Sequence, residues 1–204
     1  MNNPYICFST SLPALKLPLI LLVVFAMLSG CASNRPDRIE SQANKQEFKA
    51  NPKTRAEFAV AMQFIKTADY DKAIRHLNHV VVQAPNNPVP YINLAIAYKK
   101  MQNLKLAEEN LKAAIKLDPW NPVANNEYAL LYRKTGRFSE ARQVYENLLD
   151  KYPKFTMVHK NLGILCDIYM RDYPCAIKHY ESYSGATPDD GAVKIWIADL
   201  RNRT

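Results

Sequence analysis

The chain has 204 residues, of which 48% are hydrophobic and 23% charged, and its formal net charge at pH 7 is +8. This length suits one domain, and the content of large apolar residues excludes a wholly disordered chain. The positive charge by itself would fit a nucleic-acid-binding protein, so its meaning depends on the cellular compartment.

An apolar run of 12 residues, Leu17–Leu28, follows Lys16 and precedes the small residues Ser29, Gly30 and Cys31. A basic residue, a short apolar run and small residues in this order are typical of a secretory signal. A membrane-spanning helix needs about 20 apolar residues, so this run is too short to be a permanent span. Residues 1–30 are therefore predicted to be a signal peptide.

The sequence Leu28-Ser29-Gly30-Cys31 resembles the lipobox of bacterial lipoproteins, in which the cysteine becomes the lipidated first residue of the mature chain. The resemblance implies acyl chains on Cys31, and stable anchoring requires more than one chain. Ala32 resembles the residue found after the cysteine in lipoproteins sent to the outer membrane. The expected location is the outer membrane of a Gram-negative bacterium, facing the periplasm. An ordinary cleaved signal and an uncleaved anchor are the alternatives.

Residues 31–53 are predicted to form a flexible tether that begins with the lipidated cysteine. The stretch is polar, and Ile39 and Phe48 are its only large apolar residues. As a flexible coil, a stretch of this length reaches on the order of 25 Å, enough to hold a folded domain away from a membrane.

From residue 54 onward the sequence repeats itself. Two sets of markers recur at one constant spacing, namely Ala73, Ala107 and Ala141, and Pro85, Pro119 and Pro153. The spacing, about 34 residues, falls among the periods that are typical of repeat proteins. Ala176 and Pro188 each come one residue later than this spacing requires, so one extra residue precedes Ala176, and we expect it in the turn near Arg171. The period predicts four repeats, at residues 54–87, 88–121, 122–155 and 156–190.

This period resembles that of the tetratricopeptide repeat, a pair of antiparallel helices. Small residues stand where the first helix of each pair must approach the second, namely Ala61, Ala95, Ala129 and Gly163. Aromatic or bulky residues begin the second helices, namely Tyr70, Leu104, Phe138 and Tyr173. The resemblance implies an all-α fold, a right-handed α-solenoid of about four helix pairs.

Local sequence chemistry also predicts where these helices begin and end. Thr54 with Glu57 fits a capping box, and Asn87-Pro88 and Asn121-Pro122 fit an N-cap residue before a proline in the first helical position. Asp69 and Asp172 are expected to cap second helices, which the prolines after them should end. Residues 191–204 are predicted to form a capping helix, with Val193, Trp196, Ile197 and Leu200 facing the last repeat.

The residues that catalysis would require are not recognisable, so we expect no enzyme, no cofactor and no metal. No glycine-rich phosphate loop is present in the repeats. His76 and His79 could share a metal ion, but a zinc site needs at least three protein ligands and no third is evident. For Cys166 and Cys175 the sequence favours two free thiols, because Cys175 is one residue away from the inward-facing Ala176, and a disulfide is the alternative.

In tetratricopeptide proteins the first helices line a concave groove, and the resemblance assigns residues of this chain to it. The apolar members are Phe58, Met62, Ile92, Ile96, Leu130 and Ile164, and the polar members are Asn93, Asn126, Asn161, Lys99, Lys100, Arg133 and Lys134. Such a groove suits a helix or an extended peptide with acidic residues. We expect about half of the apolar members to belong to the core between repeats. The carboxylate clamp of chaperone-binding members is absent, since Phe58 and Met62 replace its Lys and Asn.

Charge is concentrated in the middle repeats, where residues 88–155 hold 11 basic and 7 acidic residues. Because a periplasmic location argues against nucleic acid as a partner, the excess suits acidic protein segments, anionic lipid headgroups or a polyanionic envelope polymer. The predicted function is a lipid-anchored, non-enzymatic adaptor that holds a partner protein near the membrane for assembly of the envelope or of pilus or secretion machinery. The family contains pilotins and assembly factors of this kind. The alternative is a structural subunit of a larger complex that binds through its convex face.

Overall fold

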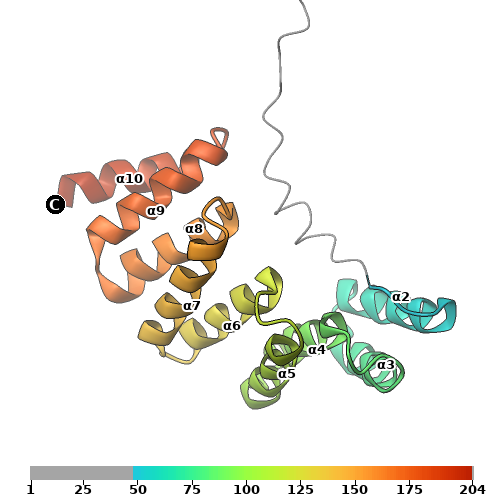
Figure 1. Cartoon of the computed structure of the whole chain (residues 1–204). Helices are drawn as coiled ribbons and strands as arrows, with labels where there is room; N and C mark the ends of the chain where they lie inside the picture. Colours follow the sequence, from blue (N-terminus) through green and yellow to red (C-terminus); the bar gives the residue numbers. More distant parts are fainter. Residues whose placement is uncertain (1–47, 204) are drawn as a thin grey trace, which may run out of the picture. The chain divides into compact units, whose positions relative to one another are not determined.

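The computed structural model describes residues 48–203, so the predicted signal peptide, Cys31 and residues 32–47 of the tether lie outside the described residues. Every regular element within this range is helical, as the sequence predicts (Figure 1). The first helices of the pairs are α2 (Pro52–Lys66), α4 (Pro88–Lys100), α6 (Pro122–Lys134) and α8 (Thr156–Ile164). The second helices are α3 (Tyr70–Gln83), α5 (Leu104–Leu117), α7 (Phe138–Lys151) and α9 (Tyr173–Ala186), and α10 (Gly191–Arg203) follows them. None of these helices has the length and hydropathy needed to span a membrane.

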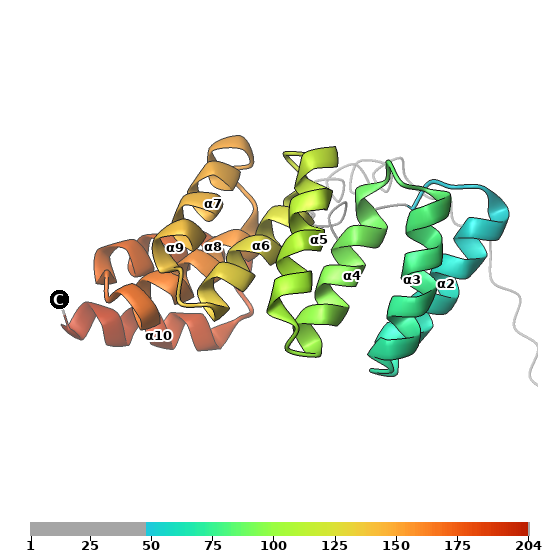
Figure 2. The ribbon, with the colours of Figure 1, turned by 90° about the horizontal axis from the view of Figure 1, so that it is seen from below.

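Each second helix packs on the first helix of its own pair and, in the first three pairs, on the first helix of the next pair. Helices α2 and α3, α4 and α5, α6 and α7, and α8 and α9 form the pairs, while α3 packs on α4 and α5 on α6. Figure 2 shows the pairs following one another in chain order. The described chain is therefore a solenoid of four helix pairs closed by α10, because each pair buries its apolar faces against its neighbours.

Four of the five predicted N-caps are present. The side chains of Asn87 and Asn121 accept hydrogen bonds from backbone N–H groups in the first turns of α4 and α6. Asp69 and Asp172 do the same for α3 and α9. The second helices end two residues before Pro85, Pro119, Pro153 and Pro188. The short polar side chains and the prolines thus set the ends of these helices.

The N-cap of the first helix differs from the prediction. Asn51, not Thr54, caps α2, and its side chain accepts from the Thr54 N–H at 2.9 Å. The Thr54 hydroxyl donates instead to Gln83 on α3. The last residues assigned to the tether are ordered, because Phe48 is buried with its ring 4.4 Å from that of Phe58. Burial of one large aromatic side chain fixes this segment against the first helix pair.

The extra residue of the last repeat lies in a helix rather than in the predicted turn. The turns between the two helices of each pair contain residues with positive φ, namely Ala68, Gln102, Gly136 and Arg171, and only the last of these comes one residue later than the regular spacing. Ala129 and Gly163 still keep the regular spacing, so the extra residue lies between Gly163 and Arg171. The chain accommodates it in the π-helix η3 (Leu165–Met170), whose wider turn takes one more residue.

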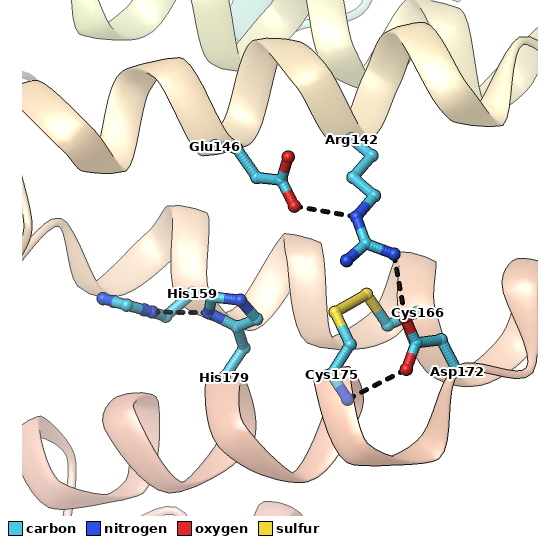
Figure 3. The surroundings of a disulfide bond; sticks show 7 residues. All are labelled: Arg142, Glu146, His159, Cys166, Asp172, Cys175 and His179. Atoms are coloured by element: carbon cyan, nitrogen blue, oxygen red, sulfur yellow. Dashed lines mark hydrogen bonds and ion pairs between the residues drawn. A yellow bond between two sulfur atoms is a disulfide. The ribbon is translucent and has the colours of Figure 1, made fainter.

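Cys166 of η3 and Cys175 of α9 form a disulfide, with their Cα atoms 5.9 Å apart (Figure 3). The favoured expectation of two free thiols is therefore wrong. That expectation placed the two cysteines on regular α-helices, whereas Cys166 lies in the π-helical segment η3. The bond ties η3 to α9 at the point where the repeat departs from its period.

The capping helix α10 buries Val193, Ile197 and Leu200 against the last pair, in a cluster that includes Tyr180. Trp196 was expected to face the same way, but it remains partly exposed at the edge of this contact, its ring 5.4 Å from that of Tyr180. The polar residues of the helix face solvent, as a terminal helix of a solenoid requires.

Candidate functional site

The C-terminal ends of two first helices and the π-helix surround an open hollow of about 480 Å³. Its lining consists of Lys99 and Lys100 of α4, Gln102 after α4, Leu130, Arg133 and Lys134 of α6, and Tyr169 of η3. We call this feature the basic hollow. Four cationic side chains of two neighbouring repeats converge there around one aliphatic and one aromatic side chain.

Five predicted groove residues line the basic hollow: Lys99, Lys100, Leu130, Arg133 and Lys134. The remaining apolar members lie elsewhere. Ile92 is buried in the core between repeats, and Ile96 packs on the same cluster. Phe58 packs in the first helix pair, where Met62 joins it, and Ile164 packs on the cluster of the last pair. Much of the predicted apolar floor is therefore packing between repeats.

The predicted asparagines of the groove make hydrogen bonds within the protein. Asn161 of α8 donates to the Asn126 side chain of α6 at 2.8 Å, and Asn93 donates to the Val89 carbonyl oxygen of its own helix. The first contact joins two successive repeats. The Asn161–Asn126 contact therefore helps to hold repeats three and four together.

Lys99 of the basic hollow has a partner within the protein. Its ammonium group pairs with the carboxylate of Glu127 on α6, and each side chain is only 17% exposed. This ion pair joins repeats two and three across the hollow's wall. A partly buried pair is less screened by salt than a surface pair, so it can fix the position of Lys99.

Arg133 differs from Lys99, because its Nη1 is buried and has no hydrogen-bond partner among the described residues. Its guanidinium carbon lies 5.7 Å from the centre of the Tyr169 ring. Tyr145 of α7 is fully buried and its hydroxyl likewise lacks a hydrogen-bond partner; its pKa is raised by burial, and the charge of Arg133 acts in the opposite direction. A buried N–H group without an acceptor is costly, and such groups in native structures call for an explanation.

Sequence reasoning missed Tyr169 and Gln102 as lining residues. Tyr169 reaches the hollow from the π-helix, so its place depends on the extra residue of the last repeat. Gln102 lies in the turn after α4 at a positive φ of 62°. The longer spacing to Ala176 and Pro188 is the one signal in the sequence that marks this repeat as irregular.

The histidines take part in contacts between helices. His76 Nδ1 lies 2.7 Å from Glu57 Oε1 and His79 Nδ1 lies 3.5 Å from the same oxygen. The hydrogen bond with His76 lowers the pKa of Glu57. His159 and His179 contact each other through their Nδ1 atoms at 3.0 Å (Figure 3). Burial, together with the charge of His159, lowers the pKa of His179 to about 4, so His179 is neutral at pH 7.

One set of three potential metal ligands lies close together within residues 48–203, namely Cys166, Asp172 and Cys175. Both cysteine sulfurs are bonded to each other. Asp172 is engaged by Arg142 at 2.8 Å, which lowers the pKa of its carboxyl group. A disulfide sulfur does not supply the thiolate that a metal needs. The geometry of this cluster is therefore that of a structural crosslink.

Comparison with known proteins agrees with this geometry. A family model described as tetratricopeptide repeat matches residues 101–162. The structure of pilF from Pseudomonas aeruginosa superposes with a TM-score of 0.67 over 74% of this chain and 68% of that chain, at 21% sequence identity. YrrB, described as a TPR protein with an unusual peptide-binding site, superposes with a TM-score of 0.58 over 69% and 72% of the two chains, at 16% identity. The chain has a tetratricopeptide-repeat fold.

A curated relative is 39% identical over 67 residues, and it is the probable UDP-N-acetylglucosamine–peptide N-acetylglucosaminyltransferase SPINDLY of Solanum lycopersicum. The match covers 32% of this chain and 7% of that protein, so the chain spans a small part of the relative's length. The transferase activity in that name belongs to the relative. Tetratricopeptide repeats provide surfaces for binding proteins and peptides, and this is the coarse function that the fold supports.

Proposed function

We propose that this protein is a lipid-anchored adaptor of the bacterial periplasm that holds an acidic segment of a partner protein in its basic hollow, for assembly of the envelope or of pilus or secretion machinery. The observation that carries the proposal is the convergence of Lys99, Lys100, Arg133 and Lys134 around Leu130 and Tyr169. A surface that combines cations with exposed apolar side chains suits a segment carrying acidic and apolar residues.

Two further features support the proposed location. The sequence around Cys31 resembles a lipobox, and the apolar run before it is too short to span a membrane. Disulfides persist in oxidising compartments such as the periplasm, which suits the bond between Cys166 and Cys175. The likeness to pilF supports an assembly role only as a fold analogy, because a fold does not fix a function.

The partner can be captured by crosslinking the tagged protein in cells and identifying the proteins that copurify with it. Leu130→Glu places a negative charge in the basic hollow, so it should remove the specific partners by repulsion of their acidic groups. Val82→Glu is the matched control, since Val82 is 81% exposed on the second helix α3. If Val82→Glu loses the partners and Leu130→Glu keeps them, the concave site is wrong and a structural subunit that binds through its outer face replaces it.

The anchor is tested separately by mass spectrometry of the mature N-terminus. We expect the chain to begin at Cys31 with acyl chains attached, and a Cys31→Ser variant to lose the modification and leave the membrane fraction. A mature protein that begins at another residue, or that retains residues 1–30, would contradict the proposed anchor.

A further inference from the structure

Arg133 lines the basic hollow without an ion pair to any carboxylate of the described residues, and its buried Nη1 and the buried hydroxyl of Tyr145 both lack a hydrogen-bond partner. Cations in the last turn of a helix interact favourably with its dipole, and this accounts for the exposed Lys100 and Lys134 at the ends of α4 and α6. The dipole supplies no hydrogen-bond acceptor to Arg133, whose guanidinium can meet a partner only through the nitrogens other than the buried Nη1.

The repeat itself shows what is missing at Arg133. Lys99 and Arg133 are separated by one full repeat, so they occupy the same position in successive repeats. Lys99 pairs with the carboxylate of Glu127 in the following repeat. The residue one full repeat after Glu127 is Asn161, which is neutral and donates its side-chain N–H to Asn126. The acid that satisfies Lys99 thus has no counterpart for Arg133.

We propose that Arg133 is the anchoring donor of a carboxylate-binding subsite, in which an aspartate or glutamate of a partner polypeptide takes the place that Glu127 takes at Lys99. This inference rests on the proposed function and names the group that the basic hollow recognises. A guanidinium binds a carboxylate through two parallel hydrogen bonds, which an ammonium group does not reproduce. The Tyr169 ring, 5.7 Å from the guanidinium carbon, covers one side of this donor.

The remaining lining favours a polypeptide over a free anion. Leu130 and Tyr169 lie in the same hollow as the four cations, and Tyr169 remains 43% exposed. An acidic segment with apolar neighbours would cover these side chains while its carboxylate reaches Arg133. Lys100 and Lys134 are exposed at the rim, where charges act mainly on the rate of association.

The test measures binding of fluorescently labelled poly-L-glutamate to the full-length chain in detergent, by anisotropy at low and moderate salt. Arg133→Gln and Arg133→Lys should each weaken binding about tenfold, since both remove the paired hydrogen bonds. Lys116→Gln is the control, because Lys116 is exposed on α5 and outside the hollow's lining. If Arg133→Lys binds like the unaltered protein, or if Lys116→Gln loses as much as Arg133→Gln, binding reflects general charge and the subsite is wrong.

A second variant tests the repeat argument directly. Asn161→Glu restores the acid that Lys99 has in Glu127, so it should satisfy Arg133 from within the chain. We expect this variant to weaken polyglutamate binding about as much as Arg133→Gln, and to melt at a higher temperature than Asn161→Gln, which is neutral and serves as its control. Equal binding by Asn161→Glu and Asn161→Gln would overturn the proposal, even if every Arg133 variant proved poorly folded.

Inorganic polyphosphate, used as a second probe, separates carboxylate from phosphate recognition. Because a guanidinium also binds phosphate through paired hydrogen bonds, the losses for the two probes are compared, and we expect Arg133→Lys to weaken polyglutamate binding more than polyphosphate binding. Loss of polyphosphate binding confined to Arg133→Lys, with polyglutamate binding retained, would assign the hollow to phosphate and contradict the proposal.

If the Arg133 variants keep polyglutamate binding while Leu130→Glu loses the crosslinked partners, the subsite fails and the adaptor function stands. If the Arg133 variants lose polyglutamate binding while Leu130→Glu keeps the crosslinked partners, the subsite stands and the adaptor function of the hollow fails.

Discussion

Single residues decide how closely the helices of a pair approach, and Gly163 is the clearest case. A Cβ atom at Gly163 would lie 2.5 Å from Cδ1 of Tyr180, closer than van der Waals contact allows. Tyr180 of α9 is fully buried in a cluster that also includes residues of α10, so its ring has little room to move. The corresponding positions Ala61, Ala95 and Ala129 carry a methyl group and are equally buried. Position 163 therefore needs a glycine, because the last pair packs the large Tyr180 ring over this position.

We predict that Gly163→Ala lowers the free energy of unfolding by about 1–3 kcal/mol, because the added methyl group overpacks the contact with Tyr180. Gly185→Ala is the matched control in the same helix pair, since nothing lies within 4 Å of its added Cβ. That control should gain up to about 1 kcal/mol from helix propensity. Both values are measured by urea unfolding followed by circular dichroism, and a loss in both variants would contradict the assigned contact.

His179 makes the stability of the last pair depend on pH. Its side chain is buried beside His159 and below Arg142 and Glu146 of α7 (Figure 3). Burial, followed by the charge of His159, lowers the pKa of His179 from 6.5 to about 4. Between these two values the unfolded chain binds a proton that the folded chain does not bind. The free energy of unfolding therefore decreases as the pH falls through this range.

The decrease in the free energy of unfolding that His179 causes reaches at most about 3 kcal/mol below pH 4, and it is absent above pH 6.5. Urea unfolding between pH 7 and pH 4 measures it as the difference between the unaltered protein and His179→Gln, since carboxyl groups elsewhere titrate in both. The decline should be shallower in the variant. Parallel curves for the two proteins would show that His179 is not the group responsible.

At the scale of helices and turns, the turns inside the four pairs share one backbone conformation, although a different residue occupies it in each pair. The turn inside each pair needs a left-handed residue, which is Ala68, Gln102, Gly136 or Arg171. Only Gly136 adopts this conformation without a steric penalty, because the others carry a Cβ atom. The turn is therefore imposed by the packing of the two helices rather than by the residue within it.

Substitutions at two of these turn positions should change the free energy of unfolding in opposite directions. Gly136→Ala should lower the free energy of unfolding by about 1 kcal/mol through backbone strain alone, since its added Cβ has open space around it. Ala68→Gly should raise it by about 0.5 kcal/mol, because glycine's freedom in the unfolded chain offsets part of the gain. Thermal and urea unfolding of both variants provides the measurement, and changes of the same sign would contradict this explanation.

At the scale of the whole described chain, stability depends on neighbouring pairs and on the terminal helix. Val193, Ile197 and Leu200 of α10 cover the last pair, and Arg201 pairs with Glu181 of α9 at 2.6 Å. In a solenoid each unit contacts mainly its neighbours, so removal of the cap should act on the adjacent pair first.

We predict that a chain ending at Asp190 loses amide protection in α8 and α9, while protection in α2 and α3 changes little. Hydrogen exchange followed by mass spectrometry measures both regions in one sample. Ile195→Ala is the control, because Ile195 is 70% exposed on α10 and its truncation should leave exchange unchanged. Equal loss throughout residues 48–203 would mean that the solenoid unfolds as one cooperative unit.

The sequence by itself determined the all-α class, the four helix pairs and most of their ends, because those depend on local features that recur once in every repeat. Asn87, Asn121 and the four prolines act within one helical turn, so their effect is visible without the partner helices. The small residues from Ala61 to Gly163 mark the close approaches for the same reason. The predicted location, the anchor at Cys31 and the division into domains remain predictions.

Only the tertiary structure decided the burial of Phe48, the disulfide and the basic hollow, because each depends on side chains that different elements bring together. Polar residues flank Phe48 in the sequence, and its side chain becomes buried only because it packs against Phe58 and Val89. Cys166 lies in the π-helix and bonds to Cys175 of α9, and no period in the sequence shows that a π-helix takes up the extra residue of this repeat. Lys99 and Arg133 occupy equivalent positions, yet only the first finds an acid in the next repeat. A periodic sequence fixes the backbone of every repeat alike, whereas the side chains that a repeat receives from its neighbours make each surface different.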